Sequence, residues 1–235
     1  WLISSSILRP MQRKFTFSVG EYYHLYNRGV DKRSIFVQKK DWQRFNKLLY
    51  VANSTIPFRF SDVEDKSLNQ IDRGDIIVAI GAYTQMPNHF HILAKEIVKN
   101  GISIFMEKLT TGYSMYFNKR YERSGTLFQG RFRAQHVSED EHLKYLYAYI
   151  HLNPVKIIEP RWREVGIKNK KTAREYLDSY KFSSYVDYCG IQREELAILA
   201  KNEFPDYFSK AHSFDEYIRS WLNFGSEQNI QGLPL

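Results

Sequence analysis

The stretch DIIVAIGAYTQMPNHFHILAKE, residues 75–96, contains two apolar runs that meet at Pro87-Asn88. Proline and asparagine favour a tight turn, and the run on each side is long enough to form a strand. The stretch therefore predicts an antiparallel hairpin. Its second strand begins with two histidines, His89 and His91, which are one residue apart.

The strand geometry places these two histidines together. Side chains alternate between the faces of a strand, so both imidazoles should lie on one face, while Phe90 and Ile92 pack on the other. Two neighbouring imidazoles offer a pair of nitrogen ligands for a metal. Two half-exposed or hydrogen-bonded histidines are the commoner explanation of such a pair, so the rest of the chain has to decide.

The elements on either side of the hairpin define the fold class. Strand and helix patterns follow one another as a strand that runs into a turn, a helix, the hairpin, a second helix, an edge strand and a third helix. Their expected positions are 21–33, 39–54, 75–87 with 89–96, 103 onward, 124–138 and 139–152. This order predicts an α+β fold of ferredoxin-like character, an antiparallel sheet with helices packed on one face.

The sequence pattern changes in the last third of the chain. This part begins with charged, irregular stretches such as KNKKTAREY and continues with short helical patterns over 192–202 and 214–222. We expect residues 161–235 to form a mainly helical C-terminal extension that packs on the core, with DNA recognition as an open role. Met11 is a candidate natural start, which would leave residues 1–10 outside the native chain.

The charge of the chain indicates a polyanionic partner. There are 34 Lys and Arg residues against 26 Asp and Glu, a net charge of +8, and 16% of residues are aromatic. Cations that follow phosphates and rings that stack on bases suit single-stranded nucleic acid. Candidate phosphate contacts are Lys119, Arg120, Arg123, Arg131 and Arg133, although a solvated charged face explains any one of them equally well. Candidate stacking rings are Tyr113, Tyr116, Phe117 and Tyr121.

Cysteine content and hydropathy exclude other classes. The single cysteine, Cys189, excludes an intramolecular disulfide framework and a cysteine-rich zinc site, and it fits a cytoplasmic location. No apolar run approaches the about 18 residues of a membrane span, so no membrane partner is expected. The remaining histidines are assigned to structural or surface positions: His24, His136, His142, His151 and His212.

The predicted helix over 139–152 adds two more candidates. Tyr149 and Asn153 are four residues apart and share one helical face. A phenol is a possible nucleophile, and an amide oxygen is a competent ligand for a hard metal. Taken individually, Tyr149 is better explained as a ring at the edge of the core, and Asn153-Pro154 as the end of the helix. His89, His91 and Asn153 together would supply two nitrogens and one oxygen to a metal.

At these residues the chain resembles a known family. MPNHFHIL followed by LYAYIHLNPVK is similar to the single-tyrosine HUH transposases, and in particular to the REP-associated tyrosine transposases. HUH denotes His-hydrophobe-His, which His89-Phe90-His91 matches. The resemblance also includes YYHLYNRGVDKRSIF and GTLFQGRFRAQHV, so it extends over roughly residues 20–160, and FSSYVDY resembles the segment that usually follows.

The resemblance implies a catalytic domain over 11–160 with Tyr149 as nucleophile and Asn153 as third metal ligand, where many relatives carry Gln. Tyr145 and Tyr147 are the nearby competitors. It also implies Mg²⁺ or Mn²⁺ as cofactor, single-stranded or hairpin DNA as partner, and a monomer or homodimer.

The leading hypothesis is thus a DNA strand transferase that works through a 5′-phosphotyrosine. Two alternatives stay open: a protein that binds structured nucleic acid without cutting it, and a metal-dependent phosphodiesterase that uses water. The sequence does not identify the hairpin, the cleavage sequence or the host process.

Overall fold

The computed structural model describes residues 16–208 and 210–223, so the question of Met11 and residues 1–10 lies outside the described residues. Four antiparallel strands form one sheet in the order β2-β3-β1-β4. The strands are β1 (Tyr22–Arg28), β2 (Val78–Met86), β3 (His89–Glu96) and β4 (Arg133–Val137). With a helix after β1 and another after β3, this is the ferredoxin-like arrangement, and the predicted fold class is confirmed.

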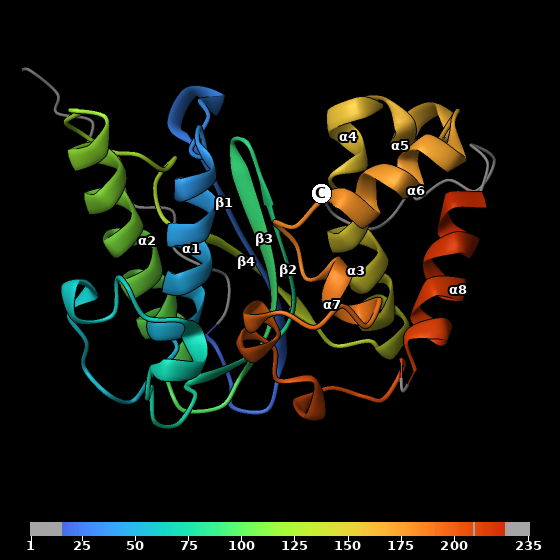
Figure 1. The fold of residues 1–235 in the computed structure, drawn as a ribbon. Coiled ribbons are helices and arrows are strands. Elements are labelled where there is room, and N and C mark those ends of the chain that lie inside the picture. The colour runs from blue at the N-terminus through green and yellow to red at the C-terminus, as the bar shows by residue number, and fades with distance from the viewer. Residues whose placement is uncertain (1–15, 209, 224–235) are drawn as a thin grey trace, which may run out of the picture.

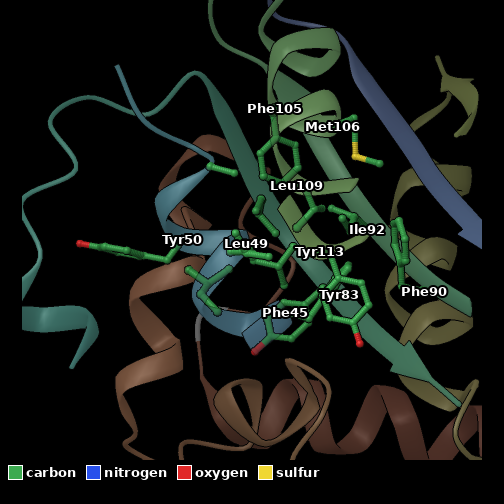
Figure 2. Close-up of a cluster of buried hydrophobic side chains, with 14 of the residues drawn as sticks. Phe45, Leu49, Tyr50, Tyr83, Phe90, Ile92, Phe105, Met106, Leu109 and Tyr113 are labelled. Atoms are coloured by element: carbon green, nitrogen blue, oxygen red, sulfur yellow. The ribbon is translucent and has the colours of Figure 1, made fainter. Parts of the chain in front are cut away.

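One face of the sheet is covered by the two helices of the ferredoxin-like unit, α1 (Lys39–Val51) and α2 (Gly101–Arg120). The core between them is largely aromatic, and Figure 2 shows Phe45 of α1 and Tyr113 of α2 directed toward Phe90 of β3. The ring centroid of Phe45 lies 4.9 Å from that of Phe90 and 5.1 Å from that of Tyr113. As predicted, Phe90 and Ile92 point into this core and away from the histidines.

The third helix, α3 (Asp140–Leu152), packs on the opposite face of the sheet (Figure 1). The expectation of helices on one face thus describes α1 and α2 but not α3. The cause lies in the strands, because β2 is buried along its whole length and the middle of β3, from Phe90 to Ala94, is buried on both faces. Ile92 enters the core under α1 and α2, whereas its neighbour Leu93 enters the core under α3. A strand that is apolar on both faces needs cover on both.

The chain beyond α3 packs against this second face and the free edge of β2. It forms α4 (Val155–Ile158), α5 (Trp162–Val165), α6 (Lys170–Ser179), α7 (Tyr185–Tyr188) and α8 (Ala211–Asn223). The helix α6 occupies the segment that the sequence suggested was irregular, and the Asn169 side chain caps it by accepting from the Thr172 backbone at 3.0 Å.

The edge of β2 is protected by the same part of the chain. The amide of Gln85 donates to the carbonyl of Phe182 at 2.9 Å, and the amide of Ser184 donates to the carbonyl of Tyr83 at 3.0 Å. These bonds occupy groups that would otherwise be an open template for another strand. Among the described residues, no helix is long and apolar enough to span a membrane.

Candidate active site

The site lies where β1 and β3 run side by side beneath α3. Arg28 is paired with His89 and Tyr26 with His91 across the two strands, so these four side chains belong to one face. Because β1 ends and β3 begins at this point, the site lies at one end of the sheet, at the top of Figure 1.

Each histidine of the pair is oriented by a second residue through Nδ1. His89 Nδ1 lies 2.6 Å from Asn88 Oδ1, and the amide nitrogen of Asn88 donates to the carbonyl of Lys32 at 3.2 Å. The amide orientation of Asn88 therefore makes His89 Nδ1 the donor and leaves Nε2 with its lone pair. His91 Nδ1 lies 2.9 Å from His24 Nε2. An imidazole held at one nitrogen and free at the other has the usual arrangement of a metal ligand.

His24 was assigned to a structural or surface position, and the structure places it inside the site. It is buried, its ring stacks on that of His91 with centroids 5.0 Å apart, and its edge meets the ring of Tyr149 at 5.5 Å. The alternation of YYHLYNRG could have placed His24 and Tyr26 on one face. The sequence alone did not show that this face adjoins His91, because that depends on the pairing of β1 with β3.

The three histidines share an environment that favours the neutral imidazole. Burial lowers the pKa of His24 to about 3 and that of His89 to about 4. Burial also holds the pKa of His91 well below its ordinary value of 6.5. The positive charge of Arg163 adds to the lowering at all three. At pH 7 these rings are neutral, and only the neutral form has a lone pair for a metal.

Of the three tyrosines on α3, Tyr149 is the one that contacts the histidines. Its ring centroid is 5.4 Å from that of His91. Tyr147 points into the second core, where it is 2% exposed. Tyr145 lies one turn back, with its ring 6.0 Å from that of Tyr149 and 5.1 Å from that of Trp221, and burial raises its pKa to about 12.

Asn153 ends α3 and is almost fully buried. Its amide nitrogen donates to the carbonyl oxygen of Tyr149 at 2.9 Å, which leaves Oδ1 as the atom that could bind a metal. Within residues 16–208 and 210–223, no group of three or more His, Cys, Asp or Glu is arranged to hold a metal ion. A site built on the histidine pair therefore depends on an amide oxygen or on the substrate for further ligands.

The predicted phosphate contacts lie in the last turn of α2, in the segment that follows it and at the start of β4, and they differ in their surroundings. Arg120 pairs with the buried carboxylate of Asp41 at 3.6 Å. Arg123 donates to the side chain of Asn118 at 2.9 Å. Lys119, Arg131 and Arg133 are exposed. Arg133 is paired with Tyr26, which puts it on the face of the histidines.

The four candidate stacking rings differ in their burial. Tyr113 and Phe117 are buried in the first core. The hydroxyls of Tyr116 and Tyr121 donate to the carboxylate of Asp41, at 2.9 and 2.7 Å. The stacking role proposed for Tyr113 and Phe117 was wrong, because both rings face inward. For the half-exposed Tyr116 and Tyr121 it stays a prediction.

Fold and site together define an α+β protein in which a histidine pair on a strand faces a tyrosine on a helix. Comparison with known proteins agrees with the resemblance found in the motifs. Residues 68–153 match the model of the family "Transposase IS200 like", a span that contains both histidines of the pair, Tyr149 and Asn153.

The solved structures give the same picture of the fold. A REP-associated tyrosine transposase bound to a REP hairpin is 14% identical, and the match covers 80% of this chain and 90% of that chain with a TM-score of 0.50. A putative transposase from Deinococcus radiodurans R1 is 12% identical over 60% of this chain and 95% of that chain, with a TM-score of 0.33. A tRNA(His) guanylyltransferase from Saccharomyces cerevisiae is 10% identical over 87% and 86%, with a TM-score of 0.34. The comparison with curated proteins found no match.

Proposed function

We propose that this protein is a DNA transposase of the REP-associated single-tyrosine type, which cleaves and rejoins single-stranded DNA beside a hairpin. The observation that carries the proposal is the contact of the Tyr149 ring with His91, whose partner on the same strand face is His89. The match to the IS200-like transposase family and the fold shared with a hairpin-bound transposase support it.

The donor set fits a divalent ion. His89 and His91 each keep Nε2 free, and their ring centroids are 5.0 Å apart. They would hold Mg²⁺ or Mn²⁺ through these nitrogens, and Asn153 would add Oδ1. A bound ion would neutralise the charge that builds up on the phosphate during the reaction.

Tyr149 would carry the covalent step. Its phenolic oxygen attacks the phosphorus, a bond forms between them, and the bond from phosphorus to the 3′ oxygen breaks. The leaving 3′ oxygen takes up a proton, and the DNA remains joined to Tyr149 as a 5′-phosphotyrosine. Attack by a 3′-hydroxyl from another strand reverses these steps and releases Tyr149, so rejoining needs no nucleotide cofactor.

A denaturing gel tests this proposal directly. Wild-type protein, Mn²⁺ and labelled hairpin DNA with single-stranded flanks should give a protein–DNA band that survives denaturant. Tyr149→Phe removes one oxygen and keeps the ring that packs on His24 and His91, so the band should vanish while the fold and DNA binding remain. Tyr145→Phe and Tyr147→Phe are matched controls on the same helix and should keep the band.

Each other outcome has a definite meaning. Cleavage without a covalent band, in the wild type and in Tyr149→Phe alike, identifies water as the nucleophile and supports a phosphodiesterase. Tight binding with no cleavage supports a protein that only recognises structured DNA. A band lost in Tyr145→Phe or Tyr147→Phe, and kept in Tyr149→Phe, moves the nucleophile to another tyrosine of α3.

A further inference from the structure

A cation from the C-terminal extension lies against the tyrosine of the site. The guanidinium carbon of Arg163, on α5, is 4.3 Å from the centroid of the Tyr149 ring. The charge of Arg163 also acts on His24, His89 and His91, as their lowered pKa values indicate. Arg163 therefore lies among the very groups that form the candidate active site, although it falls outside the family match over 68–153.

Among residues 16–208 and 210–223, the terminal nitrogens of Arg163 have no hydrogen-bond partner. Both Nη1 and Nη2 are buried, and within the described ranges neither makes a hydrogen bond. A guanidinium stays charged and carries five N–H donors. Burying Nη1 and Nη2 without hydrogen-bond partners therefore costs free energy. Other arginines of the extension are paired, Arg174 with Asp178 at 3.0 Å and Arg193 with Asp187 at 2.6 Å. An anion brought by a ligand would satisfy Arg163.

Lys156 supplies a second cation to the same place. It lies on α4 directly after α3 and is half-buried, and its backbone amide donates to the carbonyl of Asn153 at 3.0 Å. Its charge acts on His89 and His91 together with that of Arg163. Burial lowers the pKa of Lys156 to about 8, and repulsion from Arg163 adds to this. Two cations that repel each other beside neutral histidines are stabilised when an anion binds between them. The planar fork of arginine matches two oxygens of one phosphate.

We propose, building on the function proposed above, that Arg163 and Lys156 form the binding site for the phosphodiester that Tyr149 attacks. Arg163 binds the non-bridging oxygens through Nη1 and Nη2, and Lys156 contributes a second positive charge. The C-terminal extension then completes the active site, because the domain over 11–160 lacks Arg163.

DNA affinity measured without cleavage tests this site. The probe is a fluorescent hairpin oligonucleotide with single-stranded flanks of randomised sequence, and the protein carries Tyr149→Phe. Adding Arg163→Met should weaken binding by roughly tenfold, as expected when a hydrogen-bonded charge pair is lost. The slope of log affinity against log salt should become shallower by about 0.7, the contribution of one phosphate on a single strand. Arg59→Met is the matched control, an exposed arginine in the segment between α1 and β2, and should change neither.

Stability separates a ligand site from a structural role. Arg163→Met removes unpaired buried donors and keeps an unbranched side chain against Tyr149, so the melting temperature without DNA should equal or exceed that of the parent. Arg163→Lys keeps the charge but loses the fork, so it should retain the parent salt slope with lower affinity. Should Arg163→Met fail to fold, Arg163→Lys decides: lower affinity at an unchanged slope supports the proposal, and parent affinity overturns it.

The outcomes also separate this inference from the proposed function. DNA binding by Arg163→Met equal to that of Arg59→Met overturns the inference, even if wild-type protein forms the covalent band. Weakened binding by Arg163→Met supports the phosphate site, even if no covalent band forms in the wild type and the strand-transfer proposal fails.

Discussion

The contact between His24 and His91 has consequences for any metal held by the histidine pair. If His91 binds through Nε2, its Nδ1 must carry the proton and donate it, and His24 Nε2 at 2.9 Å is then the acceptor. His24 would thus fix both the tautomer and the ring plane of His91. Asn88 would fix the tautomer and the ring plane of His89 in the same way. Such supporting residues commonly alter metal affinity by about 10- to 100-fold.

Substitution of His24 tests this positioning role. His24→Leu removes the acceptor and should weaken Mn²⁺ binding by roughly tenfold or more. His24→Gln, whose amide oxygen reaches close to the position of Nε2, should restore most of the affinity. Calorimetric titration with Mn²⁺ in the absence of DNA measures both, and thermal melts check the fold. Equal Mn²⁺ affinity in His24→Leu and wild type would show that His91 needs no support from His24.

The candidate site residues that were found from the sequence differ from the missed ones in how they reach the site. Alternation along one strand pairs His89 with His91, and helical periodicity pairs Tyr149 with Asn153. His24 reaches the site through strand pairing, and Arg163 reaches it through the packing of the extension. Contacts of that kind depend on tertiary structure, which a local pattern does not contain.

At the scale of elements, α3 links the site to the extension. Tyr149 faces the histidines of the sheet, whereas His151, two residues on, points into the second core. His151 Nε2 lies 2.7 Å from the hydroxyl of Ser184, and the ring packs on Tyr188 and Phe214, with centroids 5.4 and 5.2 Å away. The docking of the extension therefore surrounds an ionisable group with apolar rings.

This histidine makes stability depend on pH. Burial lowers the pKa of His151 to about 3, and the charge of Lys201 adds to the lowering. The unfolded chain, with a histidine pKa near 6.5, binds more protons than the folded chain between about pH 3 and 6.5. Stability contributed by neutral His151 is therefore present above pH 6.5 and is lost as pH falls below it.

The variant His151→Gln isolates this effect, because it does not titrate and keeps a polar atom toward Ser184. Other buried histidines also destabilise the protein in acid, so the quantity to measure is the difference between wild type and variant. Urea unfolding from pH 7 to 4.5 should show the wild type losing stability more steeply, by at most about 1.4 kcal/mol per pH unit. Parallel curves would mean that His151 binds a proton as readily in the folded state as in the unfolded state.

The elements themselves were largely predictable. The hairpin follows from its apolar strands and Pro87-Asn88, and α3 begins and ends within a residue of its predicted bounds, 139–152. The helix α6 was missed because most of its residues are charged or polar. Its packed face consists of Ala173 and Leu177, one turn apart, which was the only apolar periodicity available.

At the scale of the whole molecule, several basic segments gather at one end. The C-terminal end of α2 with Lys119, the start of β4 with Arg133, and the segment with Lys156 and Arg163 all lie at the end that holds the site (Figure 1). The net charge of +8 is a property of composition, but its layout around Tyr149 depends on the fold. A field of this kind favours approach of DNA at the site.

Preference for DNA structure and salt dependence test this layout together. Three probes of equal strand length should be compared in the Tyr149→Phe protein: a hairpin with single-stranded flanks, a single strand without a hairpin, and a blunt duplex. The two probes with unpaired DNA should bind more tightly than the blunt duplex, because the reaction proposed for Tyr149 takes place on single-stranded DNA. Affinity should fall steeply with salt, by roughly 0.7 in log–log slope for each phosphate neutralised. Arg133→Gln, on the face of the histidines, should make the slope shallower by about that amount. Arg59→Gln, an exposed arginine between α1 and β2, should leave the slope unchanged. A flat salt response, or equal affinity for the blunt duplex, would contradict a binding surface centred on Tyr149.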